Sequence, residues 1–273
     1  MRAKFLKSFD KAKIYYEKSE ADKNKWLVFL HGFGGDLGAW EKEIEYFTNL
    51  GYSTLALDLR GHGLSSKSDD IDFYKLENFA KDLKLIIDAE KIKRPVILGH
   101  CFGGMVTSYF QAKFPKISKA LILIDTSFKP PFISPFGVQE VFLKHIFDLL
   151  ATISPNTGSY SHADFNQFIG TADIDLARIF SDISHTSLKS YLLLCEQLSG
   201  FDLRKLFSKI NVPTLIIQGS EDSIYPMEIA KYLHSRIKKS ELDIIEGANH
   251  ILVLNNPSEL EQSIQSFLMK INF

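Results

Sequence analysis

Short apolar runs alternate with amphipathic segments along both ends of the chain. The continuous apolar run at residues 25–30 is typical of a strand buried on both faces, and further strands are predicted at 53–57, 96–98, 120–124, 213–218 and 242–245. Two shorter runs, 5–8 and 13–17, predict an opening hairpin. Helical spacing between the runs predicts helices at 37–50, 74–89, 102–114, 226–236 and 257–269. This alternation predicts an α/β fold whose mostly parallel, eight-stranded sheet carries helices on both faces.

The alternation is interrupted in the middle of the chain. Pro130, Pro131 and Pro135 open a section of helical patterns without a convincing strand before residue 212. We therefore predict a core made of residues 1–127 and 208–273, with residues 128–207 inserted as a helical cap. The cap is expected over the carboxyl edge of the sheet, which is where open α/β sheets bind their ligands.

Composition narrows the classes of function. Of the 273 residues, 45% are hydrophobic and 24% charged, and the net charge of −1 predicts no groove for nucleic acid and no affinity for an anionic membrane surface. No segment approaches the roughly 20 apolar residues of a membrane span, and the basic first residues lack the apolar run of a signal peptide. We expect a cytoplasmic protein whose partner is a small-molecule substrate. The sequence leaves open whether the protein forms a homodimer.

The stretch from Gly99 to Gly104, which reads GHCFGG, joins a predicted strand to a predicted helix. A sharp turn here needs neighbours without side chains, and Gly99 and Gly103 provide them on the two sides of Cys101. The helix N-terminus favours a thiolate. These features predict that Cys101 is a nucleophile rather than an inert buried thiol. Cys195 lies in an apolar helical pattern and is expected to be a buried small hydrophobe.

Five motifs resemble those of the α/β-hydrolase family, in the order expected for it and over nearly the whole chain. GHCFGG fits the pattern G-x-S-x-G, with Cys101 in the place of the serine. The other four are HGFGG at 31–35, which resembles the oxyanion loop, DLRGHGLS at 58–65, GSED at 219–222 and GANH at 247–250. The last two resemble the turns that carry the family's acid and histidine.

The resemblance implies a catalytic triad in the chain order nucleophile, acid, base: Cys101, Asp222 and His250. It also implies that the backbone N–H groups of Phe33 and Phe102 form an oxyanion hole. Asp125 is the rival for the acid, because some members of the family carry their acid after the corresponding strand. No metal and no cofactor are expected, since no histidine pair has a convincing third ligand and the glycine-rich loop at 32–35 lacks the lysine of a P-loop.

The cysteine at the serine position leaves two interpretations open. Cys101 is either the native nucleophile of a thiol hydrolase, as in the dienelactone-hydrolase branch, or an engineered replacement of serine. The large insertion is unlike that branch. Sulfur is larger than oxygen and forms longer bonds, so a site shaped for serine would lose rate.

Phenylalanines concentrate in the predicted cap. Phe128, Phe132 and Phe136 are predicted to line an apolar pocket above Cys101, although the cap's own core could equally take such residues. We predict hydrolysis of a small or medium uncharged carboxylic ester, lactone or thioester through a covalent acyl-enzyme. The alternatives are a C–C bond hydrolase or cofactor-free lyase on the same fold, and a non-enzymatic receptor for a small ligand.

Overall fold

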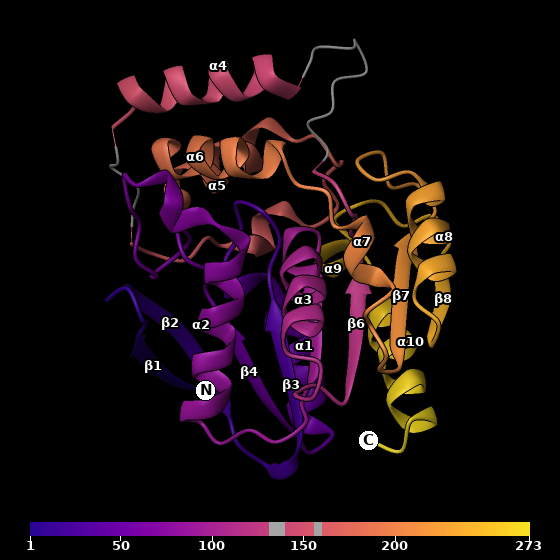
Figure 1. The fold of residues 1–273 in the computed structure, drawn as a ribbon. Coiled ribbons are helices and arrows are strands. Elements are labelled where there is room, and N and C mark those ends of the chain that lie inside the picture. The colour runs from indigo at the N-terminus through magenta and orange to yellow at the C-terminus, as the bar shows by residue number, and fades with distance from the viewer. Residues whose placement is uncertain (131–139, 156–159) are drawn as a thin grey trace.

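The computed structural model describes residues 1–130, 140–155 and 160–273, with the backbone alone for 140–144. A single sheet crosses the molecule in the strand order β1-β2-β4-β3-β5-β6-β7-β8 (Figure 1). The strands are β1 Arg2–Lys7, β2 Lys13–Ser19, β3 Asp22–Leu30, β4 Tyr52–Leu57, β5 Val96–His100, β6 Ala120–Ile124, β7 Thr214–Gly219 and β8 Ser240–Ile245. β1 and β2 are antiparallel to their neighbours and all other pairings are parallel. The predicted fold class is confirmed.

Helices cover both faces of the sheet and divide the core into two clusters. One cluster contains side chains of α1 Glu41–Asn49, α9 Leu252–Asn255 and α10 Pro257–Lys270. The other contains side chains of α2 Leu76–Ala89, α3 Phe102–Lys113 and α8 Met227–Arg236. Along β3 the side chains alternate between them: Leu27 and Phe29 join the first, Val28 and Leu30 the second. A strand apolar on both faces needs cover on both sides, which explains the continuous apolar runs.

The described part of residues 128–207 is helical and lies above the carboxyl ends of the strands (Figure 1). It contains α4 Glu140–Ile153, the 3₁₀ turn η3 Phe165–Phe168, α5 Leu176–Thr186, α6 Leu188–Ser199 and α7 Arg204–Phe207. Leu193, Leu194 and Leu198 of α6 are buried in the core cluster on the α3 side. The cap's boundaries stay a prediction. Among the described residues, no helix has both the length and the apolar character that crossing a bilayer requires.

The DLRGHGLS motif is a structural element that holds the loop after β4. The Arg60 guanidinium is fully buried and donates two hydrogen bonds to the Asp82 carboxylate, at 2.7 and 2.8 Å, and one to Asp10 at 2.9 Å. The positive charge of Arg60 can be buried because two carboxylates pair with it and accept its hydrogen bonds. Asp58 lies 2.8 Å from the Nε2 of His162, which connects this loop to the helical segment above the sheet. The remaining 3₁₀ turns are η1 Leu37–Trp40 and η2 Ile71–Tyr74.

Candidate active site

Cys101 lies in a strained turn between β5 and α3. Its backbone has φ 50° and ψ −114°, a conformation that side chains seldom adopt. Close backbone packing holds this turn: a Cβ on Gly99 would lie 2.3 Å from the carbonyl oxygen of Gly103, and a Cβ on Gly103 would lie 2.3 Å from that of Leu30. The Thr126 hydroxyl donates to the Cys101 carbonyl at 2.6 Å. The turn therefore requires glycine at both positions and presents the sulfur above the sheet edge.

The surroundings of the sulfur favour the thiolate. Burial by itself raises the pKa of Cys101, but the charge and hydrogen bond of His250 and the backbone N–H groups of Phe33 and Phe102 lower it below the ordinary value overall. These are the two N–H groups predicted as oxyanion donors, and both hydrogen-bond to the sulfur. A negative charge that moves from sulfur to a carbonyl oxygen stays within their reach.

His250 connects the sulfur to a carboxylate. Its Nδ1 lies 2.9 Å from Oδ2 of Asp222, which leaves Nε2 for the sulfur. Burial opposes protonation of the imidazole, but Cys101 and Asp222 raise its pKa well above 6.5. Burial also opposes ionisation of Asp222, yet the hydrogen bond and charge of His250 and the N–H groups of Ile224 and Tyr225 lower its pKa. The structure thus brings the three predicted residues into one chain of contacts.

Asp125, the alternative acid, has a different environment. It is fully buried, its Oδ1 accepts a hydrogen bond from the Gly219 N–H at 2.8 Å, and its Oδ2 has no partner among the described residues. Burial raises its pKa well above 3.8, which favours the protonated carboxyl over the carboxylate. Asp222, and not Asp125, accepts the hydrogen bond from Nδ1 of the His250 imidazole. Asp125, His100 and His250 do cluster with potential ligand atoms within 4.8 Å of one another, but Nδ1 of His250 is already bonded to Asp222.

His100, the residue before the nucleophile, supports the base from the other side. Its Nε2 lies 2.8 Å from the carbonyl oxygen of His250, and since a carbonyl can only accept, the Nε2 carries the proton. Burial lowers the pKa of His100 to about 3, so the ring is neutral. The only sequence signal was its position next to Cys101, which does not indicate a contact 150 residues away.

Two further residues act on the site and were not predicted. Tyr225, buried beside the sulfur, hydrogen-bonds to Cys101, and burial raises its pKa so that the phenol remains a donor. Asp173, which precedes α5, accepts hydrogen bonds from the backbone N–H of His250 at 2.7 Å and from the N–H and hydroxyl of Ser223 at 2.8 and 2.6 Å. Both loops of the acid–base pair are thereby tied to one carboxylate. Neither residue belongs to a sequence motif that would predict these contacts.

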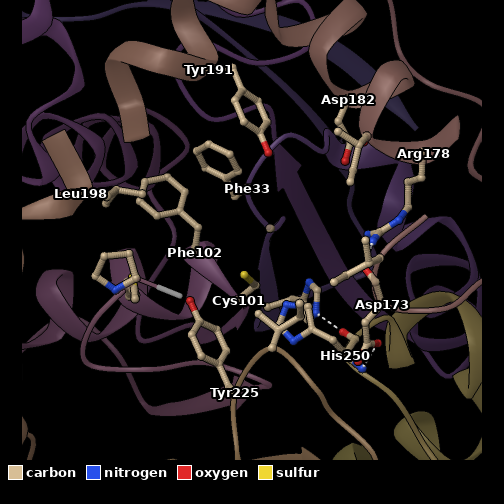
Figure 2. A pocket seen from close by; sticks show the side chains of 17 residues that line it. Phe33, Cys101, Phe102, Asp173, Arg178, Asp182, Tyr191, Leu198, Tyr225 and His250 are labelled. Carbon is tan, nitrogen blue, oxygen red and sulfur yellow. Dashed lines mark hydrogen bonds between the residues drawn. The ribbon is translucent and has the colours of Figure 1, made fainter. Parts of the chain in front are cut away.

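A cavity of about 200 Å³ lies above Cys101. Phe33, Phe102 and Leu198 contribute to its apolar wall, while Arg178 and Asp182 of α5 bring charges to it (Figure 2). Neither charged residue was predicted from the sequence, since their helical spacing is equally typical of a solvated face.

Of the three phenylalanines predicted to bind substrate, Phe128 is the one that the structure describes. The ring of Phe128 packs against Tyr232 with centroids 4.9 Å apart, and it does not line the cavity. The backbone N–H of Leu203 donates to the Phe128 carbonyl, so the chain turns toward α7 and α8 at this point. Phe128 is therefore not part of the described cavity wall, and its role in substrate binding stays a prediction. Phe132 and Phe136 lie outside the described residues.

Comparisons with known proteins identify the family of the chain. The sequence profile of a family described as "alpha/beta hydrolase fold" matches residues 25–257. Human protein ABHD8 is 25% identical over 247 residues, covering 89% of this chain and 55% of that protein, so the chain spans about half the length of this relative. The 3-oxoadipate enol-lactonase 2 of Acinetobacter baylyi is 25% identical over 272 residues, covering 98% of this chain and 97% of that protein.

Solved structures share the fold. The crystal structure of a hydrolase from Pseudomonas aeruginosa superimposes with a TM-score of 0.78 at 21% identity, covering 97% of this chain and 98% of the other. At this identity the likeness concerns the fold alone.

Proposed function

This chain belongs to the α/β-hydrolase fold family, and we propose that it hydrolyses small to medium uncharged carboxylic esters, lactones or thioesters through an acyl-enzyme on Cys101. The observation that carries the proposal is the contact chain of Cys101, His250 and Asp222 at the floor of a cavity, with two backbone N–H groups aimed at the sulfur. The name of the bacterial enol-lactonase relative supports a lactone or ester as substrate.

In the first half-reaction, the Cys101 thiolate attacks the carbonyl carbon and a C–S bond forms. The electron pair of the carbonyl moves onto oxygen, where the N–H groups of Phe33 and Phe102 stabilise it. Loss of one such donor typically costs about 3 kcal/mol of transition-state stabilisation. When the tetrahedral intermediate collapses, the C–O bond of the ester breaks, or the C–S bond of a thioester substrate. The His250 imidazolium then protonates the leaving alkoxide or thiolate.

In the second half-reaction, the now neutral His250 takes a proton from a water molecule, and the hydroxide attacks the thioester carbonyl. Collapse releases the carboxylic acid and restores the thiolate–imidazolium pair. Asp222 holds the imidazole with Nε2 toward the reacting atoms and stabilises its charged form. Tyr225 donates a hydrogen bond to the sulfur when it is a leaving group.

The test is a panel of p-nitrophenyl esters and lactones, with intact-protein mass spectrometry on the reacting enzyme. We expect turnover and an acyl adduct on Cys101 that is absent from Cys101→Ala. Turnover without an adduct, with products from a cleaved C–C bond or an elimination, would favour the C–C hydrolase or lyase. Binding of a small ligand without any turnover would favour the receptor.

The same panel separates the two interpretations of the cysteine. Cys101→Ser is expected to collapse the activity when the site is built for a thiol and to increase it strongly when the site is built for serine.

A further inference from the structure

The wall of the cavity has chemically different sides. In Figure 2, Phe102 and Leu198 lie on one side of Cys101, and Arg178 and Asp182 on the other. The two charged residues are four positions apart on α5, so their side chains leave the helix on the same face. Both line the cavity that contains the sulfur.

These two side chains do not pair with each other. An arginine and an aspartate four positions apart on a helix are spaced to form an ion pair. Within the described residues, Arg178 donates from Nη2 to the backbone carbonyl of Asp173 at 2.5 Å, its buried Nε has no hydrogen-bond partner, and the Asp182 carboxyl makes neither a hydrogen bond nor an ion pair. Buried polar groups are normally satisfied. Hydrogen-bonding capacity is therefore left over on two side chains that both line the cavity.

The charges restrict what this capacity can bind. Burial raises the pKa of Asp182 to about 7, with Asp36 adding to the shift and Arg178 opposing it. Above this pH the carboxylate and the guanidinium offset each other. A carboxylate on the substrate would then be repelled by Asp182, and an ammonium group on the substrate would be repelled by Arg178. A hydroxyl accepts from an N–H and donates to a carboxylate, so it satisfies both without a net charge.

We infer that Arg178 and Asp182 form a subsite for a hydroxyl group of the substrate, which makes the preferred substrates uncharged hydroxy-esters or hydroxy-lactones. The inference rests on the proposed function and deepens it. The reacting carbonyl lies at Cys101, the hydrocarbon part lies toward Phe102 and Leu198, and the hydroxyl lies toward α5. Arg178 and Asp182 bind and orient this group and take no part in proton transfer.

The experiment compares p-nitrophenyl 3-hydroxybutyrate with p-nitrophenyl butyrate, measured above neutral pH. One pair of charge-assisted hydrogen bonds is expected to favour the hydroxy-ester about ten-fold or more in kcat/KM. Arg178→Met and Asp182→Leu are each expected to bring this ratio close to one. The control is Phe180→Gln on the same helix, whose side chain is exposed and which should leave the ratio unchanged.

Several outcomes overturn the inference. A wild-type ratio near one does so, and so does a ratio that survives both variants. A preference for the p-nitrophenyl monoester of succinate also overturns it, because the subsite would then bind a carboxylate instead of a hydroxyl. If no ester is hydrolysed, the proposed function fails separately. The subsite is then tested by whether methyl 3-hydroxybutyrate protects Cys101 from iodoacetamide better than methyl butyrate, and equal protection rejects it.

Discussion

Cys101 lies in a turn whose shape close backbone packing enforces, whereas the loops of Asp222 and His250 share, besides their backbone contacts, one carboxylate from the segment above the sheet. At the nucleophile, Gly99 allows the strand to touch the start of the helix four residues later, and Gly103 allows the helix to touch the backbone of β3 at Leu30. At the acid–base pair, the Asp173 carboxylate holds both loops across 50 and 77 residues. The nucleophile is therefore positioned by backbone packing in the sheet core, while the alignment of the base depends in addition on the segment above the sheet.

The largest effect is expected from removing the base. His250→Ala should lower kcat by about 10³- to 10⁴-fold, because it removes the proton acceptor and the charge that stabilises the thiolate. His234→Ala, on the exposed end of α8, is the matched control and should retain activity. Steady-state kinetics on an ester substrate measures both. A loss below ten-fold would remove His250 from the mechanism.

Adding one methyl group to the turn tests its backbone packing. Gly103→Ala places a Cβ 2.3 Å from the Leu30 carbonyl, and this clash should destabilise the fold by about 3 kcal/mol or more. Gly200→Ala is the control, since its Cβ meets nothing within 4 Å. Denaturant unfolding compares the two. Equal stabilities would show that the turn relaxes easily, which would undo the contrast between the two regions.

The two cysteines are expected to differ in reactivity, because their environments shift the thiol pKa in opposite directions. The pKa of Cys101 is lowered, so its thiolate persists to lower pH than that of a free thiol, while burial raises the pKa of Cys195. Near neutral pH, iodoacetamide should alkylate Cys101 about ten-fold or more faster than Cys195. Peptide mapping across a pH series measures the rates. In His250→Ala the midpoint for Cys101 should move upward, and an unchanged midpoint would contradict the ion pair.

The smallest effect is expected at Asp173. Asp173→Ala leaves the N–H of His250 and both donors of Ser223 without their acceptor, and kcat should fall about ten-fold with KM little changed. Asp173→Asn retains one acceptor oxygen and should recover part of the loss. A merely structural role would lower the melting temperature without shifting the pH–rate profile, so the profile is the decisive measurement.

The strand and helix pattern was predictable because it depends on local chemistry. Continuous apolar runs require burial on both faces, and the glycines around Cys101 indicate a turn that excludes side chains, whatever lies elsewhere in the chain. The family resemblance then supplied the pairing of Cys101 with Asp222 and His250. Their catalytic roles remain predictions, although their contacts are part of the structure.

What the sequence by itself determined is therefore the fold class, the turn at Cys101 and the set of candidate acids. Only the tertiary structure decided that Asp222 rather than Asp125 bonds to the imidazole, that Asp173 holds both loops, and that Arg178 and Asp182 face the cavity. It also turned Phe128 away from the cavity. The physical reason is that periodicity and backbone sterics act over a few residues, whereas contacts between distant side chains depend on how whole elements pack.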